Sequence, residues 1–121
     1  MQNIIKRGTT TIKPKENKLF YIAHPYSGNI EENMASVIEK TNELLDRGFK
    51  IICPLTHSHW LDLAKKRDPD FWYDLDIAIM EKCDGLILSP GWQESRGCIL
   101  EYGYFMGQKK PVYLYEELIK P

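Results

Sequence analysis

The chain has 121 residues, enough for one domain with a real hydrophobic core. Hydrophobic residues make up 43% of it and charged residues 27%, as in soluble globular proteins, and the net charge of −1 gives no electrostatic attraction to nucleic acid or membranes. No apolar run approaches the length of a membrane span, and three scattered cysteines predict reduced core thiols. We therefore expect a cytoplasmic protein.

Residues 1–17 are polar and basic, and we expect an N-terminal arm or a short extra strand around residues 9–12. The first firm element is a continuous apolar run at residues 18–23, typical of a strand buried on both faces. A loop rich in turn residues follows at residues 24–29. Apolar residues at helical spacing then predict a helix over about residues 30–47, ended by Gly48, before a second strand at residues 49–53.

The next segment carries His57, His59 and Trp60, and the pattern favours a polar loop above the sheet, extending to Pro69. With His24, these histidines could in principle hold a catalytic zinc ion. Because a His-x-His pair alone is a weak pattern, hydrogen-bonding histidines are the favoured interpretation. We expect no metal and no cofactor.

A second helix is predicted from the Asp68-Pro69-Asp70 start to about residue 83. Its periodicity places Asp74 on a polar, solvated side and Asp76 on an apolar flank, one turn after Trp72. An apolar setting raises the pKa of a carboxyl group. Asp76 is therefore either a functional carboxyl or a capping or salt-bridging surface residue.

A third strand at residues 84–89 leads into a helix that begins near residue 94 or 95 and ends near residue 107. Glu101 is the single charged side chain between Gly97 and Gly107, and burying a carboxylate is costly unless it is paired or used. The start of the helix carries Ser95 and Gly97, which suit anion binding at a helix N-terminus. The alternative is an ordinary helix that covers the sheet and whose glutamate reaches solvent at its edge.

A last strand at residues 111–115 completes a β-α alternation. This order predicts an α/β fold, flavodoxin- or Rossmann-like, with a mainly parallel sheet of four to five strands and helices on both faces. Ligands of such sheets bind at the carboxyl ends of the strands. The loops at residues 24–29, 54–60 and 89–96 should therefore converge on one rim.

Several short motifs, in this order and spacing, resemble the nucleoside 2-deoxyribosyltransferase superfamily, and most closely a small branch of it known as a domain of unknown function. They cover residues 19–115 and read Tyr21-Ile22-Ala23-His24-Pro25-Tyr26-Ser27-Gly28, Pro54-x-x-His57-Ser58-His59, Phe71-Trp72-x-x-x-Asp76, Cys83-Asp84, Gly91-Trp92-x-x-Ser95-x-Gly97-x-x-x-Glu101 and Lys110-Pro111-Val112. The resemblance implies a flavodoxin-like domain over residues 18–121.

The resemblance also implies cleavage or transfer at the N-glycosidic bond of a nucleoside or nucleoside 5′-monophosphate. By motif position, Glu101 is the nucleophile at the anomeric carbon and Asp76 assists the base, while Ser95 and Gly97 bind a 5′-phosphate. Chemically, one carboxylate can stabilise an oxocarbenium-like state while a partly protonated one feeds the leaving base.

Further substrate contacts are expected from the rim loops. Arg96 can add a charge-assisted contact to a phosphate, and aromatic side chains can stack on a base or serve in packing. The expected binding residues are His24, Tyr26, Ser27, Gly28, His57, Trp60, Trp92, Ser95, Arg96 and Gly97.

Two further expectations concern partners and activity. The resemblance implies a homo-oligomer, a dimer or tetramer, and the aromatic-rich segment at residues 102–105 has more apolar surface than one sheet face needs. The alternative to an enzyme is a protein that binds a nucleotide-like ligand without turning it over, because the fold alone does not define the activity.

Overall fold

The computed structural model describes residues 4–5 and 17–120 as a three-layer α/β fold. Its sheet has five parallel strands in the order β1-β5-β4-β2-β3. The strands are β1 (Ile4–Ile5), β2 (Leu19–Ala23), β3 (Lys50–Ile52), β4 (Gly85–Leu88) and β5 (Val112–Leu114). The predicted fold class is confirmed.

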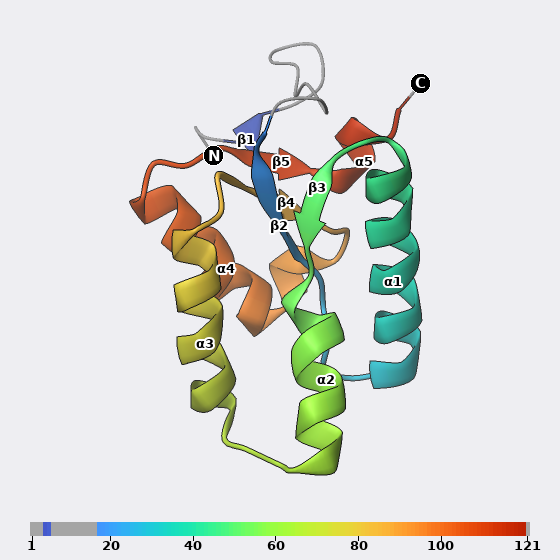
Figure 1. Cartoon of the computed structure of the whole chain (residues 1–121), viewed down its shortest axis with the longest axis vertical. Coiled ribbons are helices and arrows are strands. Elements are labelled where there is room, and N and C mark those ends of the chain that lie inside the picture. Colours follow the sequence, from blue (N-terminus) through green and yellow to red (C-terminus); the bar gives the residue numbers. More distant parts are fainter. Residues whose placement is uncertain (1–3, 6–16, 121) are drawn as a thin grey trace.

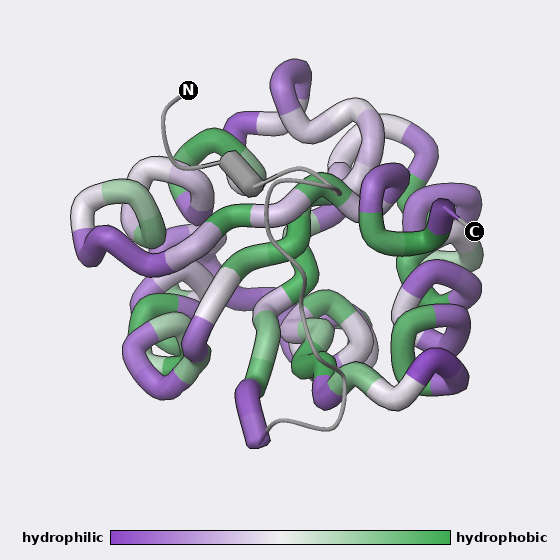
Figure 2. The backbone as a smooth tube through the Cα atoms, turned by 90° about the horizontal axis from the view of Figure 1, so that it is seen from above, coloured by the Kyte–Doolittle hydropathy of each residue, from purple (hydrophilic) through white to green (hydrophobic). Residues whose placement is uncertain are grey.

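Helices cover both faces of this sheet. They are α1 (Ile30–Asp46), α2 (Pro54–Ala64), α3 (Pro69–Glu81), α4 (Arg96–Gly107) and α5 (Tyr115–Leu118), with a 3-10 turn at Trp92–Glu94. Figure 1 shows α3 and α4 on one side and α1 and α5 on the other, while α2 extends away from the end of β3. The view along the sheet in Figure 2 shows apolar strands lying between these helical layers. None of the described helices is both long and apolar enough to cross a membrane.

Alternate side chains of β2 divide the core into two layers. Phe20 and Ile22 pack with α1, including Val37, on one face. Tyr21 and Ala23 point to the other face, where α3 and α4 close the core with residues such as Met80, Cys98 and Phe105. This alternation follows from the two-residue period of a strand, and it places the Tyr21 hydroxyl in the α3/α4 layer.

The strand order reverses between β2 and β4. The chain passes from β2 to its neighbour β3, and then returns across β2 to form β4 on the other side. Ala23 and Leu88 are register partners at the carboxyl ends of the two central strands, and the Ser89 N–H donates to the Ala23 carbonyl at 3.0 Å. Open parallel sheets bind ligands at such a switch point, so the fold directs attention to this edge.

The segment after β3 is a helix, so the predicted loop at residues 54–64 is wrong. Pro54 fits the first helical position, where no N–H is needed. The polar side chains that suggested a loop bond within the helix: the Thr56 hydroxyl donates to the Cys53 carbonyl at 2.8 Å and the Ser58 hydroxyl to the Pro54 carbonyl at 3.1 Å. Pro54 is the buried residue of this helix. The helix therefore has no buried apolar stripe, which is the sequence pattern that predicts a helix.

Other boundaries shift slightly. The last strand ends at Leu114 and passes into α5 rather than continuing to Tyr115. Helix α4 begins at Arg96 with Ser95 as its N-cap, close to the predicted start. The short strand expected at residues 9–12 lies outside the described residues, and β1 is formed by Ile4–Ile5. The three cysteines are free and buried, as predicted.

Candidate functional site

A buried tyrosine and a glutamate form the centre of the candidate site. Tyr21, wholly buried on β2, donates its hydroxyl proton to Oε2 of Glu101 on α4. Glu101 is half-buried, and it projects from the second turn of a helix whose neighbouring residues Cys98 and Phe105 belong to the core. The fold therefore holds this carboxyl against the sheet, which is one of the two alternatives that its apolar sequence context left open.

Asp76 is the second carboxyl group of the site. It lies half-buried on α3, whereas Asp74 is exposed, so the helical pattern assigned both correctly. Burial raises the pKa of Asp76 to about 6, while the nearby Tyr21 hydroxyl lowers it. Its Oδ1 atom is buried and has no hydrogen-bond partner in the structure. A buried oxygen without a partner is uncommon in folded proteins.

The two carboxyl groups influence each other. Burial raises the pKa of Glu101 to about 8, the Tyr21 hydrogen bond lowers it, and the charge of Asp76 raises it. Since both groups have raised pKa values, the site keeps a proton at neutral pH. Two carboxyl groups with separated pKa values can divide acid and base roles.

The surroundings of the pair are aromatic and apolar. Tyr73, one turn before Asp76 on α3, has a pKa raised by burial and then by Glu101 and Asp76. Burial raises the pKa of the Cys98 thiol to about 12, so this cysteine stays protonated. In the described part of the chain, neither Asp76 nor Glu101 takes part in an ion pair.

His24 lies at the end of β2 but faces the α1 layer. Its Nδ1 lies 2.7 Å from the Pro25 carbonyl, and because a carbonyl can only accept, Nδ1 is the donor. In the neutral ring Nε2 then accepts a hydrogen bond from the Ser36 hydroxyl at 2.8 Å. Lys40 in turn donates to Ser36 at 2.6 Å. Burial lowers the pKa of His24. Both ring nitrogens are thus occupied within the protein, which leaves neither for the predicted substrate contact.

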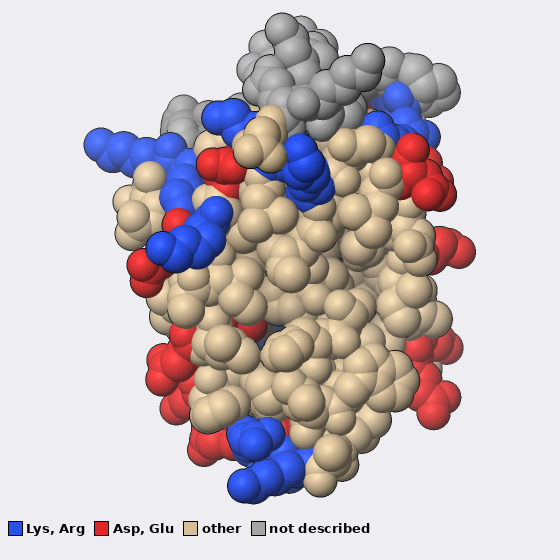
Figure 3. Space-filling model, viewed as in Figure 1, with Lys and Arg blue, Asp and Glu red and all other residues tan. Residues whose placement is uncertain are grey.

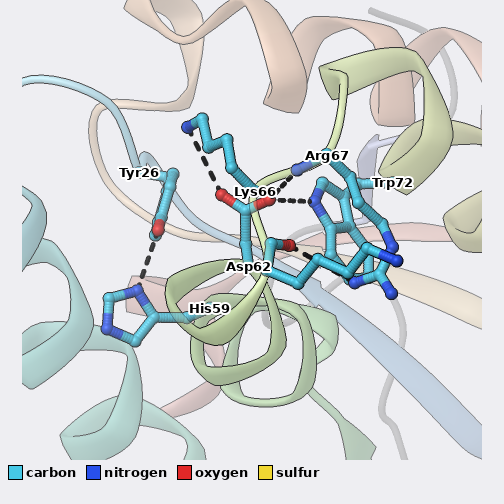
Figure 4. A network of polar contacts seen from close by, with 7 residues as sticks. Tyr26, His59, Asp62, Lys66, Arg67 and Trp72 are labelled. Carbon is cyan, nitrogen blue, oxygen red and sulfur yellow. Dashed lines mark hydrogen bonds and ion pairs between the residues drawn. The ribbon is translucent and has the colours of Figure 1, made fainter.

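Tyr26 and His59 connect the loop after β2 to α2. The Tyr26 hydroxyl lies 2.8 Å from Nδ1 of His59, with the rings edge to face (Figure 4). His57, which we expected to line the site, is exposed, and Trp60 is 60% exposed beside His59. The helix separates the directions of His57 and His59, which an extended loop would have aligned.

Asp62 fixes α2 against α3 in the same network. Its Oδ1 accepts from the Trp72 indole N–H at 2.9 Å and from the Arg67 backbone N–H at 2.8 Å, and Lys66 pairs with its other oxygen (Figure 4). The Arg67 guanidinium also lies over the Phe71 and Trp72 rings. These contacts fix the start of α3, the helix that carries Asp76.

The predicted anion site lies at the start of α4. Ser95 is its N-cap, and its hydroxyl accepts from the Cys98 N–H at 3.3 Å. Arg96 and Gly97 are exposed on the first turn, and a Cβ added at Gly97 would meet no atom within 4 Å. Trp92 is buried against Tyr102, with ring centroids 4.9 Å apart, so the structure gives this tryptophan a packing role.

The loop after β2 contains two further expected contacts, Ser27 and Gly28. Both are exposed, and Gly28 has φ of +97°, a conformation that suits glycine. The Asn33 side chain donates to the Tyr26 and Ser27 carbonyls at 3.0 and 3.2 Å. The backbone of this loop is therefore fixed, while the Ser27 side chain lies on the surface.

Sequence reasoning missed Tyr21 and His59. Tyr21 lies in an apolar run, so we interpreted it as part of the strand core. Its two-residue spacing from Ala23 puts both side chains on the same face of the sheet, the face that α3 and α4 cover. His59 became visible as the Tyr26 partner once residues 54–64 formed a helix. Within the described residues, no group of three or more His, Cys, Asp or Glu side chains could hold a metal ion.

The fold and the site define a class: a three-layer α/β protein with two buried carboxyl groups beside the switch point of a parallel sheet. The family described as "Domain of unknown function (DUF1937)" matches residues 18–117, and the chain belongs to this family. No curated protein matches the chain.

Proposed function

We propose that this protein cleaves or transfers at the N-glycosidic bond of a nucleoside or nucleoside 5′-monophosphate. The observation that carries the proposal is the pair of buried carboxyl groups, Asp76 with a pKa of about 6 and Glu101 with a pKa of about 8, linked by the Tyr21 hydroxyl. The resemblance of the sequence motifs to nucleoside 2-deoxyribosyltransferases supports the same assignment.

In the proposed reaction, Glu101 attacks the anomeric carbon. The Tyr21 hydroxyl holds Oε2, which leaves Oε1 to form the bond to carbon as the bond from that carbon to the base nitrogen breaks. Asp76 gives its proton to the departing base. Water, or the nitrogen of a second base, then displaces Glu101 and yields the free sugar or a new nucleoside.

This division of roles has a consequence for pH. Cleavage of a neutral base requires Glu101 ionised and Asp76 protonated, a state that carries one proton in total. The pair holds one proton mainly between its two pKa values, about 6 and about 8. In this window the proton resides mainly on Glu101, so the reactive arrangement, with Glu101 ionised and Asp76 protonated, is a minor form whose share of the singly protonated pair does not change with pH. We therefore expect kcat/KM for neutral bases to rise up to pH 6, stay level, and fall above pH 8.

The 5′-phosphate would be bound at the start of α4. The free N–H groups of the first turn, the exposed Arg96 and the absence of a side chain at Gly97 leave room for an anion. Trp60, which is exposed on α2, and the half-buried Tyr26 would contact the base in this proposal. Trp92 instead supports the loop through Tyr102.

The test is a panel of ribo- and deoxyribonucleosides and their monophosphates, incubated with and without a second free base. Release of base alone identifies a hydrolase, and exchange of base identifies a transferase. Glu101→Gln should bind ligand but lose nearly all turnover, whereas Glu94→Gln, an exposed glutamate before the same helix, is the matched control. Wild-type turnover in Glu101→Gln would remove this residue from the mechanism.

The phosphate assignment has its own variant. Ser95→Ala combined with Arg96→Ala should erase the preference for monophosphates over nucleosides and leave nucleoside binding unchanged. Equal binding of nucleosides and monophosphates by the wild-type protein would show that Ser95 is a helix cap alone. Tight binding without either product would instead support the non-catalytic nucleotide-binding alternative.

A further inference from the structure

Within residues 4–5 and 17–120, neither group of the carboxyl pair is paired with a basic side chain. The groups that shift the pKa values of Asp76 and Glu101, besides burial, are the Tyr21 hydroxyl and, for Glu101, the charge of Asp76. Tyr73 and Cys98, which the charge of Glu101 reaches, are a neutral hydroxyl and a thiol. No ion pair to either carboxyl occurs among the described residues.

The basic side chains on the neighbouring elements are exposed or engaged in other contacts. Arg96, at the start of α4, is exposed and forms no ion pair within the described part of the chain, and in the proposed function it contacts the phosphate. Lys110 donates to the Met80 and Glu81 carbonyls at the far end of α3, Arg67 lies over Phe71 and Trp72, and Lys66 pairs with Asp62. Figure 3 shows few charged side chains across the middle of the face formed by α2 and α3, and a small hollow there with acidic atoms visible in it.

A buried carboxylate is unfavourable unless it is paired, so without a cation the carboxyl pair keeps a proton at neutral pH, and a cationic ligand would take the place of that proton. The unpartnered, buried Oδ1 of Asp76 is a second sign of a missing partner. We infer that the preferred ligand is an N-glycoside whose base carries a permanent positive charge, such as a pyridinium nucleoside.

This inference rests on the proposed function and specifies its substrate class. A base that is already cationic leaves as a neutral molecule and needs no proton from Asp76. When its bond to the anomeric carbon breaks, the bonding electrons go to the ring nitrogen, and Glu101 forms the new bond to carbon. Asp76 can then stay ionised and face the positive ring, an interaction that strengthens in a water-poor setting.

The two substrate types should differ in their pH dependence. For a cationic base, Glu101 alone must be ionised, so kcat/KM should rise through its pKa of about 8 and remain high. For a neutral base, kcat/KM should fall above that pH, because the carboxyl pair then loses its last proton and none is left for the departing base. Binding of the cation should also release protons, because a positive charge lowers the pKa of both carboxyl groups.

The experiment separates binding from turnover. Calorimetry at pH 8 measures the binding of two compounds. The first is a carbocyclic pyridinium nucleoside, which resists cleavage because a methylene replaces the oxygen of the sugar ring. The second is identical except that a neutral phenyl ring replaces the pyridinium ring. We expect the cation to bind at least about tenfold more tightly, with an advantage that grows from pH 5.5 to pH 8.5. Buffers of different ionisation enthalpy report the released protons.

Variants locate the effect. Asp76→Asn and Glu101→Gln should each reduce the preference for the cation, and Asp74→Asn, an exposed aspartate on the same helix, should leave it unchanged. Equal binding of the two compounds, binding of neither at millimolar concentration, or the same loss in Asp74→Asn would overturn the inference.

The outcomes also separate this inference from the proposed activity. A preference for the cation without cleavage of any nucleoside would uphold the inference and refute the activity. Cleavage of neutral nucleosides with no preference for the cation would uphold the proposed activity and refute the inference.

Discussion

Replacing Glu101 by glutamine should stabilise the protein, and increasingly so as the pH rises. Burial raises the pKa of Glu101 from its ordinary value of 4.5 to about 8, so the folded state holds a proton that the unfolded chain has lost. The free energy of unfolding therefore falls with rising pH across this window. From the pKa difference, the loss is on the order of 3 kcal/mol by pH 7 and 5 kcal/mol by pH 9.

Urea unfolding at pH 5, 7 and 9 measures this effect. Glutamine is nearly isosteric and can still accept the Tyr21 hydrogen bond, so Glu101→Gln removes the titration without creating a cavity. The variant should match the wild type closely at pH 5 and exceed it most at pH 9. Glu94→Gln, at an exposed position, controls for the loss of one negative charge. Parallel pH curves for Glu101→Gln and wild type would refute the view that this carboxyl is desolvated.

Three further predictions concern the same elements. Tyr21→Phe should raise the pKa of Glu101 further by about 1 to 2 pH units, since it removes a hydrogen bond to a charged group; carbon-13 titration of the carboxyl measures this, and an unchanged pKa would contradict the bond. Asp76→Asn should slow cleavage most for bases that leave poorly, because protonation matters most there; an equal loss for good and poor leaving groups would indicate a positioning role. The protein should be a dimer or tetramer by light scattering, weakened by Leu100→Glu on the exposed side of α4, and a monomer at working concentration would refute this.

The basis for the oligomer prediction changes with the structure. The aromatic segment expected to be exposed is largely packed: Phe105 is wholly buried, and Tyr102 and Tyr104 pack against the core. The exposed apolar side chains of α4 are instead Ile99 and Leu100, at 47% and 41% exposure. Successive residues of a helix point in directions that differ by a fixed angle. Consecutive aromatic residues on a helix that packs against a sheet therefore cannot all face outward.

The sequence was sufficient for the sheet and for the two carboxyl groups. Continuous apolar runs specify strands that are buried on both faces, and β-α alternation then fixes a parallel sheet. Helical periodicity placed Asp76 and Glu101 among apolar neighbours but left a surface role open for each, and the resemblance of the motifs then singled them out. In the structure, burial raises the pKa of both groups, and for Asp76 the sequence pattern had indicated this.

Contacts between distant segments could not be predicted in the same way. The Tyr21 hydroxyl meets Glu101 across 80 positions of sequence, and no local pattern reports such a pair. Helix α2 was missed for a different reason: its Thr-His-Ser-His start has no apolar stripe, and the hydroxyl bonds that satisfy Thr56 and Ser58 appear only once the backbone is helical.

The placement of Asp76 depends on a residue far from the proposed chemistry. Asp62 on α2 receives both the Trp72 indole N–H and the Arg67 backbone N–H, so one carboxylate fixes the turn between the helices and the first turns of α3. Asp76 lies one turn beyond Trp72 on this helix, and its distance from Glu101 therefore depends on how that start is fixed. Because the charge of Asp76 raises the pKa of Glu101, a small rotation of α3 would change how the two groups share a proton. The polar network around Asp62 therefore positions the start of the helix that carries Asp76.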